Sequence, residues 1–262
     1  DAANYTMPST ASVEHCSIKP KGLSLDPSSL SKTYDKTTSV DLSRAALAGV
    51  VDGDAVAVDV SKAKGSFDGS GASDDATATV EGLALSGEGK GNYSIPSPLT
   101  VNGCSIEPKE LGLDPKSLSR AYDGSTGVDL SGAELTGVFD GDVVSVDVSK
   151  AEASFDGSGA SDSATVTVGG LALSGASAGN YSIPDPLTVG GCSIERAELA
   201  FSCPPLTKDY DGSPDVALEG FSLTGVFPGD AVSADLSNAK ASFASRDVAQ
   251  DATVEVTGLA LA

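Results

Sequence analysis

An internal repeat of 88 residues constrains this chain more than any other feature. The tripeptide Cys-Ser-Ile begins at Cys16, Cys104 and Cys192, and the interval is the same both times. Three further motifs keep this interval without a gap: Tyr-Asp at Tyr34, Tyr122 and Tyr210, Gly-Asp at Gly53, Gly141 and Gly229, and Asn-Tyr at Asn4, Asn92 and Asn180. A fixed period of this length indicates similar structural units in tandem, each with its own small core.

The residue pattern inside each repeat is that of short β-strands. Val144, Val146 and Val148 alternate with polar residues, which is the period-two pattern of a half-buried strand. Asp-Gly pairs typical of tight turns separate such runs, at residues 123–124, 140–141 and 156–157. No segment has a convincing helical period. We therefore expect an all-β fold, a linear array of three similar β-sandwich (Ig-like) modules, with β-grasp-like modules as the alternative.

The repeat also predicts the domain organisation. Taking Cys-Ser-Ile as the start of each unit, we place the first repeat at 16–103, the second at 104–191 and the third at 192–262. Residues 1–15 then form the terminal strand and linker of a preceding module, and the third repeat lacks its last strand. Proline biases the joining segments towards extended backbone, so we expect short, stiff joints.

The formal net charge of −21 limits the partners of this chain. Such a surface repels nucleic-acid phosphates and anionic lipids, so we expect no nucleic-acid partner. No run approaches the roughly 18 consecutive apolar residues of a membrane helix, so we expect no membrane insertion. The chain begins with Asp1 rather than Met, which we interpret as a processed chain or a piece of a longer one.

A catalytic site is not expected. Residues 175–179 match the Gly-x-Ser-x-Gly pattern of a hydrolase nucleophile, but a serine hydrolase also needs a histidine base. The sole histidine is His15, and the equivalent segment of the first repeat, residues 87–91, has no serine. We therefore interpret this segment as a flexible loop and the protein as a non-enzyme.

Four aspartates, Asp68, Asp74, Asp156 and Asp162, have a spacing loosely like that of a calcium loop. Calcium requires several converging oxygen ligands, and a true loop of this kind carries more carboxylates and a bidentate glutamate. We expect solvated hairpin loops and no cofactor, with weak calcium sites as the alternative.

The cysteines offer one disulfide candidate. Cys16, Cys104 and Cys192 occupy one position of the repeat, so in a linear array they lie too far apart to bond with one another. Cys203 is unique to the third repeat, and we predict that it bonds with Cys192. For Cys16 and Cys104 we expect buried, small apolar side chains, with bonds between neighbouring fibres as the alternative.

The ordered motifs resemble the YDG-type tandem repeats of large bacterial surface proteins and adhesins. The residues that carry the resemblance in the second repeat are Arg120-Ala121-Tyr122-Asp123-Gly124, Gly141-Asp142, and the segments 170–175 and 179–183. The first repeat departs from the pattern at Lys36, where the motif has glycine. The resemblance implies extracellular stalk modules at the cell surface and no catalytic residues. We interpret Tyr122 as a structural residue that buries its ring and satisfies its hydroxyl locally.

The N-terminal segment carries a spare copy of a motif, because Asn4, Tyr5 and Met7 repeat the Asn-Tyr segment that the third repeat lacks. We expect this segment to complete the third repeat of a neighbouring copy by strand addition, pairing with the strand that contains Leu259 and Leu261. The function we expect is a structural stalk or fibre segment, assembling head-to-tail with neighbouring copies or adjacent repeats. The alternative is an adhesin module that recognises a host or partner surface.

Overall fold

The computed structural model describes all residues, 1–262, and confirms the all-β expectation: it contains β-strands, short 3₁₀ turns and no α-helix. No helix in the structure is long and apolar enough to cross a membrane. The chain forms two compact units. The first comprises residues 1–110, 141–144 and 175–182, and the second comprises residues 111–140, 145–174 and 183–262.

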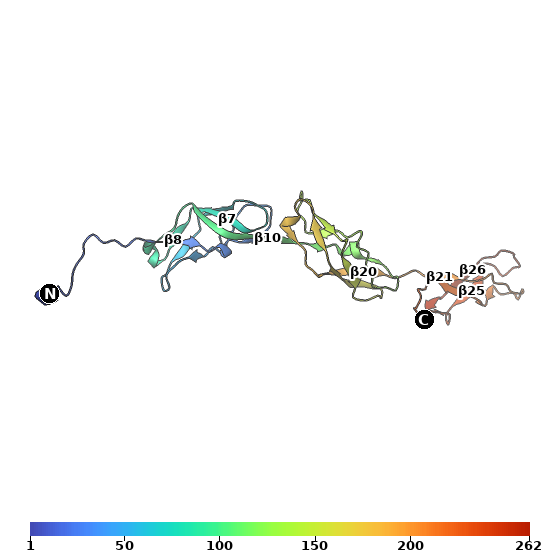
Figure 1. The fold of residues 1–262 in the computed structure, drawn as a ribbon. Helices are drawn as coiled ribbons and strands as arrows, with labels where there is room; N and C mark the ends of the chain where they lie inside the picture. Colours follow the sequence, from blue (N-terminus) through green and yellow to red (C-terminus); the bar gives the residue numbers. More distant parts are fainter. The chain divides into compact units, whose positions relative to one another are not determined.

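A four-stranded sheet organises the first unit (Figure 1). Its order is β3 (Lys32–Thr33), β10 (Leu99–Glu107), β7 (Ser73–Glu81) and β6 (Lys64–Phe67), with β10 parallel to β3 and antiparallel to β7. Three short pairs of the first repeat accompany this sheet: β1 (Lys21–Gly22) with β9 (Tyr93–Ser94), β2 (Ser24–Leu25) with β4 (Leu47–Ala48), and β5 (Ala57–Asp59) with β8 (Ala84–Ser86).

The core of the first unit follows from strand alternation. Successive side chains of a strand point to opposite faces, and every second residue of β7 is buried at Ala76, Ala78 and Val80. Leu30 follows the 3₁₀ turn η2 (Pro27–Ser29), and its side chain is also buried. Asp26 caps this turn, because its carboxylate accepts the Ser28 backbone N–H.

The second unit repeats this arrangement with the residues of the second repeat. Its main sheet has the order β13 (Arg120–Ala121), β20 (Leu187–Glu195), β17 (Ser161–Gly169) and β16 (Glu152–Phe155). Two short pairs accompany it, β12 (Gly112–Leu113) with β14 (Leu135–Thr136), and β15 (Ser145–Asp147) with β18 (Ala172–Ser174). The remaining pair of the second repeat, β11 (Lys109–Glu110) with β19 (Tyr181–Ser182), belongs to the first unit.

The third repeat, in the second unit, is less well buried than the first two. Its strands are β21 (Ala200–Ser202) with β23 (Ser222–Thr224), β22 (Asp215–Val216) with β25 (Lys240–Phe243) and β26 (Val254–Thr257), and β24 (Ala234–Asp235) with β27 (Ala260–Leu261). Equivalent leucines show the difference: Leu83 and Leu171 are 8% and 9% exposed, whereas Leu259 is 41% exposed.

The repeat boundaries expected at residues 104 and 192 fall inside strands. Strand β10 pairs with β7 at Val101 and again at Cys104, so residues 99–107 form one continuous strand of the first repeat. Cys192 lies within β20 in the same way. The reason is general: a repeat fixes the period of a tandem array but not its phase, since any residue can serve as the origin. Residues 1–20 contain the turn η1 (Ala2–Asn4) and no strand.

Candidate functional site: a tyrosine–aspartate contact

The Gly-Asp loop of each repeat presents a carboxylate that accepts a hydrogen bond from at least one tyrosine hydroxyl. In the first repeat, the Tyr93 hydroxyl donates a hydrogen bond of 2.5 Å to Asp54 Oδ2 and accepts one of 3.0 Å from the Val51 backbone N–H. Tyr93 begins β9 directly after the 3₁₀ turn η3 (Glu88–Asn92), which fixes where its ring enters the core. The hydrogen bond to the carboxylate raises the pKa of the Tyr93 phenol.

In the second repeat the equivalent carboxylate has three partners. The Tyr181 and Tyr34 hydroxyls donate to Asp142 Oδ2 at 2.6 and 2.9 Å. The Lys36 ammonium lies 3.1 Å from Asp142 Oδ1. Tyr34 and Lys36 come from the first repeat, whereas Tyr181 comes from the same repeat as Asp142, and all four residues belong to the first unit. One carboxylate therefore joins the Tyr-Asp turn of one repeat to the Gly-Asp loop of the next.

The two tyrosines at Asp142 also contact each other. The Tyr34 and Tyr181 rings meet edge to face, with centroids 5.4 Å apart and an interplanar angle of 77°. Each ring is only 5% exposed. A second contact lies beside this pair, because the Asn180 side-chain oxygen accepts the Ala72 backbone N–H at 2.9 Å. The Asn-Tyr motif of the second repeat is thus packed against the first repeat at both of its residues.

The second unit contains the same contact one period later. The Tyr122 hydroxyl lies 2.9 and 2.8 Å from the two carboxylate oxygens of Asp230, and the Tyr122 ring meets Phe227 edge to face at 5.6 Å. Tyr34 and Asp142 are 108 residues apart, as are Tyr122 and Asp230. We call this recurring contact the tyrosine–aspartate joint. It corrects the expectation that the Tyr122 hydroxyl is satisfied locally, because its partner lies in the following repeat.

The pKa shifts of the tyrosine and aspartate at the joint suit strong hydrogen bonds rather than acid–base or nucleophilic catalysis. Burial, followed by the hydrogen bond to Asp142, raises the pKa of Tyr34 to about 12. The hydrogen bond from Tyr181, with those from Tyr34 and Lys36, lowers the pKa of Asp142 despite some desolvation. At neutral pH the phenol keeps its proton and the carboxylate stays ionised. This arrangement supplies strong, charge-assisted hydrogen bonds, and it offers neither an activated nucleophile nor a base poised near neutral pH.

The aspartate of each Tyr-Asp motif closes a turn. Asp123 accepts the Ser125 backbone N–H at 2.8 Å and forms an ion pair with Arg120. Asp35 and Asp211 form the equivalent ion pairs with the lysines three residues earlier, with N–O distances of 2.6 and 2.7 Å. Gly124 adopts a positive φ of 79° in this turn. Lys36 stands at the equivalent position of the first repeat and adopts a φ of 69°, which is strained for a residue with a Cβ. Its ammonium group is the one that forms the ion pair with Asp142.

The four aspartates considered for calcium belong to exposed hairpins, and the structure brings no group of three or more His, Cys, Asp or Glu side chains together. Asp68 and Asp156 each accept a backbone N–H nine residues ahead, at Thr77 and Thr165, both at 3.2 Å. Asp74 and Asp162 lie on β7 and β17 with exposed side chains.

The predicted Cys192–Cys203 disulfide is not formed in the structure, where all four cysteines are free thiols. The Cys192 side chain points into the core of the second repeat and is fully buried, whereas Cys203 belongs to the third repeat and donates to the Glu219 carbonyl. Cys104 is buried as expected, but Cys16 is exposed. Burial raises the pKa of the Cys104 and Cys192 thiols.

The strand expected to receive residues 4–8 must also be corrected. In the first two repeats the Asn-Tyr strand pairs in parallel with β1 or β11, as Lys21 with Tyr93 and Lys109 with Tyr181. The Leu-Ala-Leu strand pairs elsewhere, and in the third repeat Leu261 pairs with Ala234. Leu259 and Leu261 are therefore not the equivalent acceptors. Asn4, Tyr5 and Met7 are exposed, with Tyr5 81% exposed.

The sequence contained a signal for the joint that the sequence analysis missed. The tyrosine, aspartate and Asn-Tyr motifs recur together in the same order, which indicates that they act together.

Comparison with known families gives a match to the YDG domain over residues 19–101, 107–189 and 196–262. No curated protein and no solved structure matches the chain. The three matches cover most of the sequence, and the chain therefore belongs to the YDG domain family, of which it contains three tandem copies.

Proposed function

We propose that this chain is a structural spacer, a stalk or fibre segment of a secreted cell-surface protein, and that it has no catalytic activity. The observation that carries the proposal is the joint. The hydroxyls of Tyr34 and Tyr181 both donate hydrogen bonds to Asp142 Oδ2. These hydrogen bonds resist separation of consecutive repeats, which is what an array that projects from a surface or carries tension requires.

Three further features support a spacer. The contact recurs at Tyr122 and Asp230 with the same sequence separation, as expected of a device used once per repeat. The negative charge keeps an exposed array soluble. The resemblance of the motifs to the YDG-type repeats of bacterial surface proteins supports the extracellular, cell-surface location that we propose.

Single-molecule stretching of the full chain tests the mechanical role. An unfolded repeat of 88 residues has a contour length of about 300 Å, at roughly 3.4 Å per residue, and unfolding releases this length less the span of the folded repeat. We expect discrete steps of about this size, and we expect Tyr34→Ala to lower the force of the step that involves the first repeat. Tyr210→Ala provides the matched control, because Tyr210 is the equivalent tyrosine of the third repeat and is 65% exposed. A chain that extends without resistance contradicts the proposal.

A further inference from the structure

The first and last strands of each complete repeat pair with each other in parallel. In the first repeat, Lys21 of β1 is paired with Tyr93 of β9, and Lys32 of β3 is paired with Ile106 of β10. The second repeat has the same two parallel pairs, β11 with β19 and β13 with β20. All other strand pairs of these two repeats are antiparallel. Parallel pairing is therefore reserved for the segments through which the chain enters and leaves a repeat.

The direction of pairing determines how tension along the chain loads these strands. A pull on the two ends of a repeat draws the first strand of a pair towards its N-terminus and the last strand towards its C-terminus. In a parallel pair these two forces oppose each other along the strands, so the hydrogen bonds between them are loaded together, in shear. In an antiparallel pair the two loaded ends lie side by side, and the hydrogen bonds open one after another.

Two hydrogen bonds outside the strand ladders reinforce the parallel pairing. In the first repeat, the Ser31 hydroxyl oxygen accepts the Ser105 backbone N–H at 3.0 Å, and the Tyr34 backbone N–H donates to the Glu107 carbonyl at 2.8 Å. The second repeat has both bonds, from Ser193 to Ser119 and from Tyr122 to Glu195, each 2.8 Å long. We call the two parallel pairs of a repeat, with these two bonds, its shear clamp.

The clamps of consecutive repeats are joined by a single residue. Strand β10 ends at Glu107 and β11 begins at Lys109, so only Pro108 separates the last strand of the first clamp from the first strand of the second. The proline ring fixes its φ and favours extended backbone before it. A pull therefore passes from one clamp to the next without a loop that could extend first.

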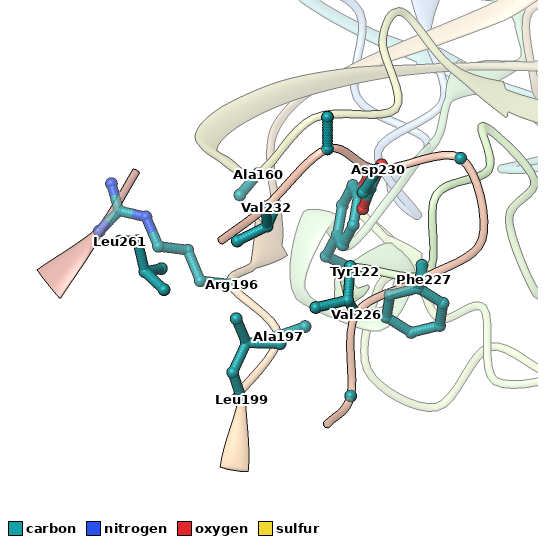
Figure 2. A pocket seen from close by; sticks show the side chains of 13 residues that line it. Tyr122, Ala160, Arg196, Ala197, Leu199, Val226, Phe227, Asp230, Val232 and Leu261 are labelled. Atoms are coloured by element: carbon teal, nitrogen blue, oxygen red, sulfur yellow. The ribbon is translucent and has the colours of Figure 1, made fainter. Parts of the chain in front are cut away.

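The tyrosine at the end of each clamp also belongs to the tyrosine–aspartate joint. The Tyr122 backbone N–H closes the clamp on Glu195, and the Tyr122 hydroxyl bonds Asp230 of the following repeat. Figure 2 shows the Tyr122 ring beside the Asp230 carboxylate and Phe227. Tyr34 makes the two equivalent bonds. The clamp and the contact with the following repeat are therefore held by the same residue.

From this topology we propose that the shear clamp is the element of each repeat that carries tension. When the chain is pulled from its ends, a repeat stays folded until the bonds of its clamp break together, and the length of the array stays constant below that force. The inference rests on the structural role proposed above, and it adds the part of the fold that resists the pull.

Each repeat contains a matched pair of serines that tests this assignment. Ser31 and Ser29 lie two residues apart, and each hydroxyl oxygen accepts a backbone N–H, from Ser105 inside the clamp and from Ala46 outside it. Their equivalents in the second repeat are Ser119 and Ser117, which accept the N–H groups of Ser193 and Glu134. Replacing either serine by alanine removes one such bond, but only one of the two bonds belongs to the clamp.

Single-molecule stretching of the full chain at constant force measures the unfolding rate of individual repeats. Ser31→Ala combined with Ser119→Ala should speed the unfolding of the first two repeats about fivefold, the factor that corresponds to one lost hydrogen bond of ordinary strength. Ser29→Ala combined with Ser117→Ala is the control and should leave the rate nearly unchanged. Because both repeats carry the change, no step has to be assigned to one of them.

The direction of pulling gives a second test, which needs no loss of a bond. An azide-bearing amino acid in place of Gly69 allows the chain to be held there instead of at its N-terminus. Gly69 is exposed, and a Cβ at this position meets nothing within 4 Å. The pull then loads β7 against β10, which are antiparallel, with Ser73 paired with Ile106.

Held at residue 69, the first repeat should open at no more than about half the force of the second, because its hydrogen bonds now break one after another. Its step is recognised by its length, at most about 130 Å for residues 69–107 at roughly 3.4 Å per residue. The second repeat is still loaded through its clamp and serves as the internal reference.

Two outcomes overturn the inference: equal unfolding rates of the two serine double variants, or a first repeat that opens at the same force in both pulling directions. In either case an unmodified chain that resists extension still supports the spacer function, so the two failures are distinguishable. A chain that extends without resistance contradicts the spacer function and the clamp together.

Discussion

Replacing Tyr34 by phenylalanine removes one hydroxyl group from the joint and keeps the ring that packs against Tyr181. The lost hydrogen bond is 2.9 Å long and ends on an ionised carboxylate. Hydrogen bonds to charged groups contribute about 1.5–3 kcal/mol. Asp142 keeps Tyr181 and Lys36, so no charge is left unpaired and the loss should lie at the lower end, about 1.5 kcal/mol.

Native-state hydrogen exchange is the suitable assay, because an array of repeats does not unfold in a single two-state transition. An effect of this size corresponds to roughly tenfold faster exchange of the amides at 141–144 and 175–182, the segments of the second repeat that belong to the first unit. The control is Tyr210→Phe, which changes a 65% exposed tyrosine. Unchanged exchange in Tyr34→Phe, or equal effects of both substitutions, refutes the reasoning.

A double-mutant cycle separates the hydrogen bond from other effects of the substitution. In an Asp142→Asn background, Tyr34→Phe should lose more than half of its effect on exchange, because the charged acceptor is already gone. Equal effects in both backgrounds would show that the hydroxyl acts through something other than Asp142.

Three further predictions concern the same structure. Because the pKa of Tyr34 is raised to about 12, its hydrogen bond stabilises the fold fully below pH 10, and this stabilisation is lost as the pH rises through 12. In an ultraviolet pH titration, the Tyr34 phenol should therefore ionise about two pH units above an ordinary tyrosine, and this late component should be absent in Tyr34→Phe. Leu118→Ala removes a side chain that is 2% exposed and should destabilise the second repeat by about 2–5 kcal/mol. The equivalent Leu206→Ala changes a half-buried side chain of the third repeat and should lower the free energy of unfolding by less. Equal losses of both variants in urea unfolding would contradict the burial described. A thiol reagent should modify two cysteines in the native chain and four after denaturation, and rapid native labelling of the buried thiols would contradict their placement at Cys104 and Cys192.

The period and the β character of this protein were predictable from its sequence. The recurrence of Cys16 at Cys104 gave the length of one repeat, and the alternation at Val144, Val146 and Val148 gave strands. The phase was not predictable, because nothing in a repeat marks its first residue. The structure shows that the cysteine motif is the end of a strand from the preceding repeat, and Cys104 therefore lies in the core of the first repeat.

The joint itself could not be derived from spacing. In a tandem array Tyr34 has two equivalent candidates, Asp54 in its own repeat and Asp142 in the next, and both follow the same Asp-Gly pair. Only the folded structure distinguishes the two candidates, because it places the Tyr-Asp turn against the Gly-Asp loop of the following repeat.

The Cys192–Cys203 disulfide is not formed, because the Cys192 side chain lies on the face of β20 that packs into the core. The short sequence separation between the two cysteines does not indicate which face of the strand carries the thiol.

We infer that the tyrosine–aspartate joint couples the Gly-Asp loop and the Asn-Tyr strand of the second repeat to the first repeat, and nuclear spin relaxation of backbone ¹⁵N measures this coupling directly. The amides of the first and second repeats report the rotational diffusion of each repeat separately. We expect the amides at 141–144 and 175–182, which belong to the first unit, to share the rotational correlation time of the first repeat in the unmodified chain, and we expect Tyr34→Ala to give them a different one. Tumbling of these two segments independently of the first repeat in the unmodified chain would contradict the account.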